Sequence, residues 1–226
     1  MGLVADIFSE KRLKKLPGHI AIGHNRYSTA GSSILKNVQP IMANFALGPL
    51  AIAHNGNLVN AIGLREELEK DGAIFQSTSD SEVIVHLIAH SKGGDFYERV
   101  IQALKQVSGA FSLLILREKE LIAVRDPYGV RPLSLGQVDG AYVVASETCA
   151  LDLIGATYIR DVEPGELLII NDSGLKSMKM LTSPRQASCI FEFIYFSRPD
   201  SYIFGGQNVN EMRKKFGAQL AREANV

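Results

Sequence analysis

The pattern in the middle of the chain decides the class of fold. Residues 110–146 read AFSLLILREKELIAVRDPYGVRPLSLGQVDGAYVVAS. Short apolar runs at 110–116, 121–124, 133–136 and 142–146 alternate with polar turns that contain Gly, Pro or Asp. Runs of this length, bounded by such residues, are typical of β-strands. This part of the chain therefore predicts a series of short strands.

Working outward, we expect helices on both sides of this block. Before it, apolar residues recur at helical spacing from Leu58 to Leu68, and two more helices follow from near Ser79 and over 96–107. After it, helices are expected over 148–154 and 209–223. The remaining expected strands span 19–27, 45–54 with a hairpin bend at Gly48-Pro49, 167–170 and 190–196. Helices grouped between blocks of strands predict an α+β fold with two stacked sheets.

Composition limits the possible functions. The 226 residues correspond to one large domain or to one domain and part of another. The chain carries 24 basic and 24 acidic residues, and a net charge of zero argues against a general nucleic-acid or membrane binder. Two cysteines cannot build a disulfide framework, which favours a reducing, cytoplasmic setting. No apolar stretch approaches the roughly 20 residues of a membrane span.

Three polar segments interrupt this regular pattern. GHNRYSTAG at 23–31 and HNGN at 54–57 each end an apolar strand, and STSDSE at 77–82 opens a helix. Ser79 and Glu82 have the spacing of a capping box at the start of that helix. We expect the three segments to converge at one end of a sheet.

Four residues in these segments suit the binding of an amino acid. The guanidinium of Arg26 can hold a carboxylate through two hydrogen bonds. Asp80 can accept an ammonium group. The Asn55 side-chain amide and the Gly56 backbone N–H together can form an oxyanion hole, because glycine lets a ligand approach the backbone closely.

Each of these residues also has a simpler interpretation. Asn-Gly is the commonest dipeptide of hairpin turns. Arg26 can be a surface arginine, and Asp80 an acid that stabilises a helix N-terminus. The spacing alone leaves both interpretations open.

Histidines and cysteines give weaker signals. Glu82, His86 and His90 recur every four residues, which fits the polar stripe of an amphipathic helix better than a metal site. His54 is expected to be packed or hydrogen-bonded. Cys149 opens a helical segment, where a thiol pKa can fall, although buried, inert thiols are commoner.

Several motifs, in order, resemble the amidophosphoribosyltransferase family. The resemblance covers nearly the whole chain, and its last motif distinguishes this family from other glutamine amidotransferases. The motifs are GHNRYSTAG, LAIAHNGNLVN, TSDSEVI, AVRDPYGVRPL, ASETCALD and CIFEFIYFSRPDS.

The resemblance implies a four-layer α/β/β/α sandwich of the N-terminal-nucleophile hydrolase type, here without its leading strand. It implies a glutamine amidotransferase domain over 1–205 and, over 206–226, the start of a connection to a phosphoribosyltransferase domain. In the family, the first domain releases ammonia from glutamine. The second uses it to displace pyrophosphate from phosphoribosyl pyrophosphate, the first committed step of purine synthesis.

The resemblance also assigns roles to residues of the three polar segments. Arg26 matches the residue that binds the glutamine α-carboxylate, and Tyr27 and Thr29 match a loop that closes over glutamine. Asp80 matches the carboxylate that takes the α-ammonium. The Asn-Gly pair at 55–56 matches the oxyanion hole.

Two features of the family are expected to be missing from these residues. The family's nucleophile is a mature N-terminal cysteine, whereas this sequence starts Met1-Gly2-Leu3, and neither Cys149 nor Cys189 has a free α-amine to act as base. We therefore expect these 226 residues alone to lack glutaminase activity. No phosphoribosyl pyrophosphate loop precedes Val226, the last residue.

The family also suggests cofactors and partners for an intact protein. Cys189 matches a ligand of the iron–sulfur cluster that some members carry, but one cysteine cannot hold a four-cysteine cluster. The intact enzyme is expected to use magnesium and to form a homo-oligomer. Two alternatives remain: the glutaminase of another class II amidotransferase, such as glucosamine-6-phosphate or asparagine synthetase, and a non-catalytic module that binds glutamine.

Overall fold

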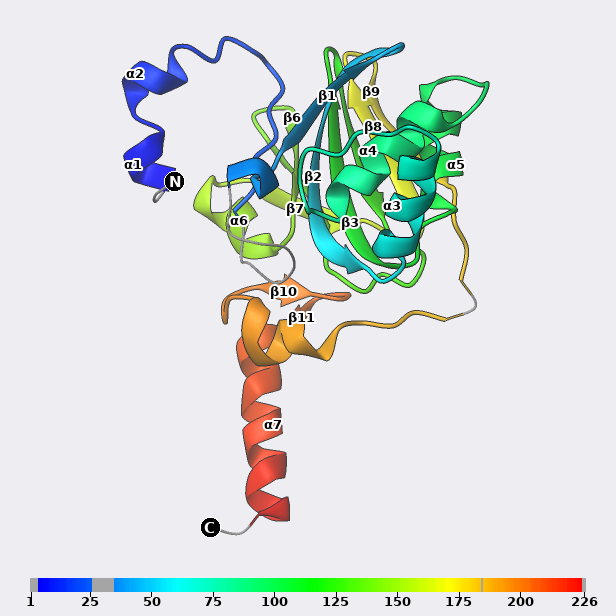
Figure 1. Cartoon of the computed structure of the whole chain (residues 1–226). Helices are drawn as coiled ribbons and strands as arrows, with labels where there is room; N and C mark the ends of the chain where they lie inside the picture. The colour runs from blue at the N-terminus through cyan, green and yellow to red at the C-terminus, as the bar shows by residue number, and fades with distance from the viewer. Residues whose placement is uncertain (1–3, 26–34, 184, 225–226) are drawn as a thin grey trace.

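Two antiparallel β-sheets are stacked face to face in the computed structural model, which describes residues 4–25, 35–183 and 185–224 (Figure 1). The first sheet has six strands in the order β1-β2-β3-β4-β8-β9, and the second has three in the order β6-β5-β7. The strands of the first sheet are β1 (Ile41–Phe45), β2 (Gly48–Leu58), β3 (Gly109–Arg117), β4 (Glu120–Arg125), β8 (Glu166–Asn171) and β9 (Gly174–Lys179). Those of the second are β5 (Ser134–Val138), β6 (Ala141–Ala145) and β7 (Thr157–Asp161).

Helices cover the outer face of each sheet. On the six-stranded sheet lie α3 (Ala61–Lys70), α4 (Ser81–His90) and α5 (Phe96–Leu104) (Figure 1). On the three-stranded sheet lies α6 (Thr148–Leu153), whose Leu151 occupies the space where a Cβ at Gly136 would stand. The predicted α+β fold with four layers is confirmed.

The alternation of side chains along the strands builds one core on each face of the six-stranded sheet. Ile52, Leu113 and Ile122 point to the helices, where they pack with Ile84 and Ile88 of α4. Neighbouring residues of the same sheet point the other way, toward the second sheet. Leu114, Ala123 and Leu168 of the first sheet pack there with Leu135 and Val144 of the second.

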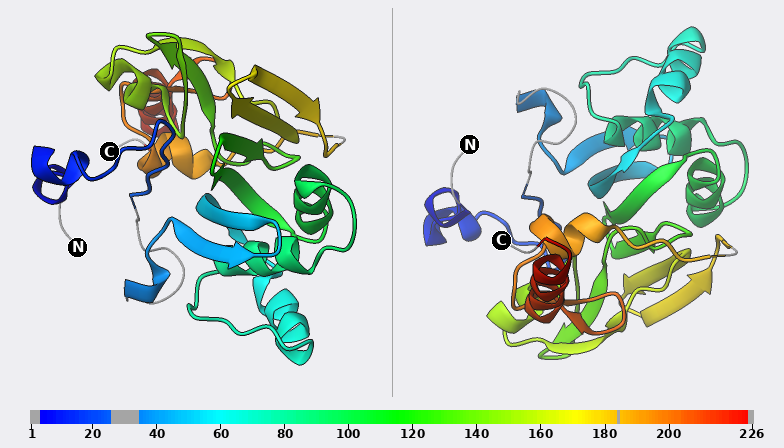
Figure 2. Two further views of the ribbon diagram at one scale, coloured as in Figure 1. Left: turned by 90° about the horizontal axis from the view of Figure 1, so that it is seen from above. Right: turned by 90° about the horizontal axis from the view of Figure 1, so that it is seen from below.

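The last part of the chain forms a smaller unit beside the sandwich. It comprises the π-helix η2 (Glu192–Phe196), the short strands β10 (Tyr202–Ile203) and β11 (Gln207–Asn208), and helix α7 (Val209–Glu223). Phe193, Ile203 and Val209 form its buried core. From there α7 runs away from the sheets, and Figure 2 shows it end-on.

The segment before β1 contains the short helices α1 (Val4–Ile7), α2 (Glu10–Leu13) and η1 (Leu35–Asn37), of which α1 and α2 lie away from the sandwich (Figures 1 and 2). The strand predicted over 19–27 is wrong for its described part, because residues 19–25 adopt no regular structure. In the described ranges, no helix combines the length and the apolar character needed to cross a bilayer.

Two other predicted strand features are also wrong. The apolar run 190–196 is not a strand, since its residues 192–196 form η2. The Asn55-Gly56-Asn57 segment does not end its strand, because β2 stays paired with β3 as far as Leu58 opposite Gly109. The hairpin itself is confirmed, although it turns at residues 46–47, just before Gly48.

Candidate functional site

A cavity of about 720 Å³ opens beside the last residues of β2. Most of its wall comes from residues 23–25, the end of β2, the start of α4, the segment from the end of β6 into α6, and η2. Gln39, Leu114 and Arg131 complete it. Two of the three polar segments singled out in the sequence therefore meet here within the described residues, together with the first residues of the third.

The end of β2 presents different chemical groups in three directions. Side chains alternate along a strand, so His54 points to the helices while Asn55 points to the second sheet. There the Asn55 side-chain amide donates to Ser146 Oγ at 3.5 Å, with one of its two hydrogens. The other hydrogen stays available to a ligand.

Backbone N–H groups on the outer edge of β2 form the third direction. Strand β1 starts at Ile41, which lies opposite Ile52, so no described strand pairs with β2 on this edge beyond that point. The N–H of His54 donates to Gln39 Oε1 at 2.7 Å, and that of Leu58 to Asp80 Oδ2 at 2.9 Å. The N–H of Gly56 lies between them, points out of the same edge by the same alternation, and borders the cavity.

Only glycine fits at position 56. A Cβ atom built there would lie 2.0 Å from the carbonyl oxygen of Ala110 and 2.6 Å from Nε2 of His54. The His54 ring thus lies over Gly56 and occupies the space that any other side chain would need. From the sequence, Gly56 was expected to let a ligand approach the backbone. The structure shows that it also lets the His54 ring pack against the backbone.

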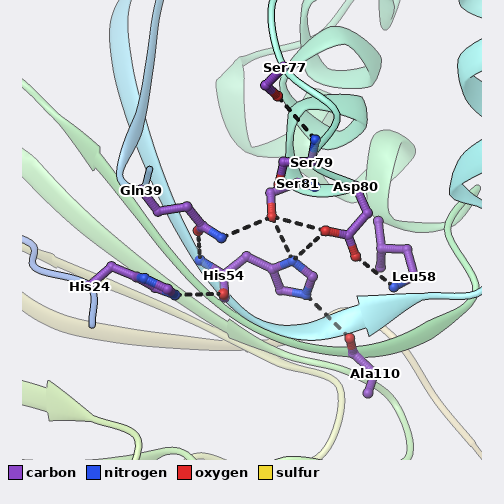
Figure 3. Close-up of polar contacts among 9 residues, drawn as sticks. All are labelled: His24, Gln39, His54, Leu58, Ser77, Ser79, Asp80, Ser81 and Ala110. Carbon is purple, nitrogen blue, oxygen red and sulfur yellow. Dashed lines mark hydrogen bonds and ion pairs between the residues drawn. The ribbon is translucent and has the colours of Figure 1, made fainter. Parts of the chain in front are cut away.

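Asp80 stands at the N-cap position of α4 and faces the cavity (Figure 3). Its Oδ2 accepts the Leu58 N–H, and its Oδ1 lies 3.3 Å from Ser81 Oγ and 3.9 Å from Nδ1 of His54. The carboxylate does not cap its own helix, since no side-chain cap bond is formed. It is oriented instead by the backbone of β2.

The protons around His54 can be assigned from its surroundings (Figure 3). The Ala110 carbonyl, 3.3 Å from Nε2, can only accept, so Nε2 carries a hydrogen. Burial lowers the pKa of His54, against the opposing effect of Asp80, so the ring is neutral and Nδ1 accepts. Ser81 Oγ, at 3.0 Å, donates to Nδ1 and therefore cannot also donate to Asp80. This leaves Asp80 Oδ1 free to accept from a ligand.

The loop before Asp80 is held by buried polar side chains. Glu82 accepts hydrogen bonds from the backbone N–H groups of Gln76 and Ser77, both at 2.8 Å, and from Ser77 Oγ at 2.6 Å. Burial acts to raise the pKa of Glu82, but these hydrogen bonds outweigh it and lower the pKa. The predicted capping box is therefore wrong: α4 starts at Ser81, and Glu82 reaches further back than Ser79.

The opposite wall of the cavity contains a buried ion pair. Arg131 Nη1 lies 2.7 Å from Glu192 Oε1, and the Arg131 guanidinium stacks on the ring of Phe196 at 4.4 Å. Burial raises the pKa of Glu192, against the opposing charge of Arg131. This pair links the segment before β5 to η2, and no pattern in the sequence predicts it.

Cys149 also borders the cavity, a position that was not predicted from the sequence. Its Sγ lies 3.7 Å from Glu147 Oε2, and burial raises the pKa of the thiol. A thiol with a raised pKa beside a carboxylate is a poor nucleophile. The expectation of an inert, buried Cys149 fits this environment.

None of the other residues predicted to belong to the site is among the described residues that line the cavity. Arg26, Tyr27 and Thr29 lie outside the described residues. Cys189 stands apart from the cavity wall, and its backbone N–H donates to the Val130 carbonyl at 3.0 Å. Among the described residues, no three His, Cys, Asp or Glu side chains are grouped as metal ligands, and Glu82 Oε1 lies 3.8 Å from Nε2 of His86.

Three further residues of the site were not predicted from the sequence. Gln39 and Arg131 line the cavity, and Ser81 contacts Gln39 and His54 beside it. Gln39 and Arg131 sit in irregular segments before strands, where no periodicity marks them. Ser81 lies inside the STSDSE segment, so of the three residues it alone belongs to a segment that the sequence marks.

Known proteins with similar sequences share this architecture. A family model described as a glutamine amidotransferase domain matches residues 24–153. Amidophosphoribosyltransferase 2 (chloroplastic) of Arabidopsis thaliana is 53% identical over all of this chain, which spans 40% of that protein. The amidophosphoribosyltransferase of Bacillus subtilis is 50% identical over all of this chain, which spans 47% of it.

A solved structure agrees with both. Glutamine phosphoribosylpyrophosphate amidotransferase from B. subtilis, complexed with ADP and GMP, superposes with a TM-score of 0.83 at 50% identity, over 90% of this chain and 44% of that one. The resemblance to amidophosphoribosyltransferases is thus confirmed, and the chain spans less than half the length of these relatives. From the family model, which matches more than half of its residues, the chain belongs to the glutamine amidotransferase domain family.

Proposed function

We propose that this chain is the glutaminase portion of an amidophosphoribosyltransferase, which supplies ammonia from glutamine for the first step of purine synthesis. One observation carries the proposal. The Asp80 carboxylate, the Asn55 amide and the Gly56 N–H border a single cavity of about 720 Å³, which can hold an amino acid. The family and the named relatives support the same substrate.

The geometry suggests how glutamine is held. Oδ1 of Asp80, left without a hydrogen from Ser81, accepts the α-ammonium group. The Asn55 amide and the Gly56 N–H donate to the oxygen of the side-chain amide, whose negative charge grows when a nucleophile attacks its carbon. Arg26, with Tyr27 and Thr29 beside it, is proposed to bind the α-carboxylate.

The rest of the reaction requires groups proposed to lie in the intact protein. An N-terminal cysteine would attack the amide carbon, and a phosphoribosyltransferase domain following residues 206–226 would receive the ammonia. The boundary at residue 205 falls inside the small C-terminal unit, whose β10–β11 hairpin spans it. The intact protein is further proposed to be a cytoplasmic homo-oligomer.

The described residues do not form a site for an iron–sulfur cluster. Such a cluster needs four thiolates, and Cys189 offers one. The other described cysteine, Cys149, is buried in the cavity wall. The Cys189 role, and a magnesium ion, therefore remain proposals about an intact enzyme, and no step of the reaction is assigned to either.

Calorimetric titration of the chain with L-glutamine tests this function. We expect the chain to bind glutamine. Asn55→Ala is expected to weaken the binding by about tenfold, because one hydrogen bond between uncharged groups of protein and ligand is lost. Asn210→Ala, an exposed residue of α7, is the matched control and should leave the affinity unchanged. A folded chain that fails to bind glutamine would contradict the proposal.

A second measurement separates the enzyme from a non-catalytic binding module. Ammonia release from glutamine by the intact protein supports the enzyme. Tight binding by the intact protein without ammonia release would favour the module instead.

A further inference from the structure

We propose that Gln39 is a positioning residue that sets the place of the Asp80 carboxylate relative to the Asn55–Gly56 donors. The proposal rests on the function proposed above, and it concerns a residue next to the cavity that the sequence pattern did not mark. Gln39 is partly buried and itself borders the cavity.

One end of the Gln39 side chain acts on β2. Because β1 starts only at Ile41, the N–H of His54 has no strand partner in the part of the chain that the structure describes. Gln39 Oε1 accepts this N–H at 2.7 Å and so replaces the missing strand at the residue just before Asn55. An unsatisfied N–H at this partly buried place would be costly, which gives the bond a clear structural value.

The other end acts on the start of α4. Gln39 Nε2 donates to Ser81 Oγ at 3.2 Å, at the residue just after Asp80. Ser81 in turn donates to His54 Nδ1 at 3.0 Å, which closes a ring of three side chains (Figure 3). A single amide group therefore joins the strand that carries the oxyanion donors to the helix that carries the carboxylate.

The neighbouring residue Asn37 binds the same loop. Its Oδ1 accepts from the Thr78 N–H, and its Nδ2 donates to Thr78 Oγ1, both at 2.9 Å. The segment 37–39 thus contacts the α4 loop on both sides of Asp80. The bond from the Leu58 N–H to Asp80 Oδ2, at 2.9 Å, reports on the position that results.

The test combines amide exchange with glutamine binding in the full 226-residue chain. Gln39→Met keeps the size of the side chain but removes both hydrogen bonds. In this variant we expect faster hydrogen exchange, measured by NMR, at the His54 amide and also at the Leu58 amide, which lies about 10 Å or more further along the strand. We also expect glutamine to bind about tenfold more weakly. Gln102→Met, on the exposed face of α5, is the matched control and should change none of these.

A second variant and a reference measurement separate positioning from a general loss of stability. Gln39→Glu retains an acceptor for the His54 N–H but loses the donor to Ser81, so the Leu58 amide should exchange faster while the His54 amide stays protected. Amides of the central strand β4 serve as the reference for global unfolding. Equal acceleration there and at Leu58 would overturn the proposal, because the effect would then be general loss of stability.

Failure of this inference is distinguishable from failure of the proposed function. If Gln39→Met accelerates exchange at His54 alone and leaves Leu58 and the glutamine affinity unchanged, the bond is local and the positioning role is wrong. If the unaltered chain does not bind glutamine, the proposed function fails. The Leu58 exchange rate then still decides whether Gln39 positions Asp80.

Discussion

Asp80 and Leu58 are joined by a hydrogen bond of 2.9 Å, from the backbone N–H of the last residue of β2 to a carboxylate oxygen at the start of α4. This bond uses one carboxylate oxygen and leaves the other facing the cavity. It explains how an acid at a helix N-terminus, where a capping role is the ordinary one, becomes available to a ligand.

The first prediction concerns the charge of Asp80. Asp80→Asn keeps an oxygen for the Leu58 N–H but loses the negative charge, so glutamine affinity should fall by about tenfold to a hundredfold while the fold is retained. The measurement is calorimetry with L-glutamine and with its analogue that lacks the α-amine. The analogue should bind both proteins equally, and a tenfold preference for the unaltered chain would contradict the assigned role.

The second prediction concerns space at Gly56. Gly56→Ala places a Cβ 2.0 Å from the Ala110 carbonyl oxygen, so the free energy of unfolding should fall by about 1–3 kcal/mol or more. Gly63→Ala, in α3 with nothing within 4 Å, is the control and should stabilise the chain by about 0.5–1 kcal/mol. Urea unfolding curves measure both. Equal stability of the two variants would show that β2 and β3 can separate here at no cost.

The third prediction concerns pH. Burial lowers the pKa of His54, so in the unfolded chain this residue takes up a proton near pH 6.5 while the folded chain does not. The free energy of unfolding should therefore decrease as the pH falls below about 6.5, by at most about 1.4 kcal/mol per pH unit from this group. NMR titration of the His54 ring is expected to give a midpoint below 6.5, and a midpoint above it would refute the assignment.

Glutamine binding should respond to the same proton. Protonated His54 would place a cation 3.9 Å from Asp80, where it competes with the α-ammonium of the ligand. His24 and Arg131 oppose that protonation, while Asp80 favours it. We expect the affinity to fall below the titration midpoint of His54, and a constant affinity across it would show that the two groups are uncoupled.

The fourth prediction concerns Glu147, which ties the C-terminal unit to the sandwich. Its Oε2 accepts from the Arg198 N–H at 2.8 Å and from Ser201 Oγ at 2.6 Å. Glu147→Ala should loosen residues 197–201 and increase the rate of limited proteolysis there by about tenfold. Asp152→Ala, an exposed residue of α6, is the control. Cleavage at equal rates in both variants would assign the docking to the other contacts of the unit, such as the Arg131–Glu192 ion pair.

Much of this fold could be predicted from the residues because local patterns and tertiary packing agree. Helix α7 spans 209–223, as its pattern predicts, and the strands of the quoted central stretch lie within a few residues of their predicted places. Strands β1, β7 and β9 were missed, as were the two-residue strands β10 and β11. The first three are edge strands whose side chains are partly or fully exposed, so none shows the apolar run that marks a buried strand.

The errors arise where packing overrides a local signal. The 190–196 run is apolar enough for a strand, but Glu192 pairs with Arg131 and Phe193 packs with Ile203 and Val209, which a helical turn permits. The Asn-Gly dipeptide signals a turn, yet pairing with β3 keeps it in the strand. Asn55 and Asp80, which border the cavity, stand out in the sequence because they are polar residues next to apolar segments. Their supporting residue Gln39 has no such mark.

The hydrogen bonds along the outer edge of β2 affect which partners can bind there. Exposed strand edges invite pairing with other chains, because their amides repeat at regular intervals. Here Gln39 and Asp80 already occupy the amides of His54 and Leu58, on either side of Gly56. A foreign strand finds no continuous ladder to extend. A small ligand needs only a single donor and is expected to reach the Gly56 amide between them. We therefore expect this edge to bind a small molecule rather than a further strand.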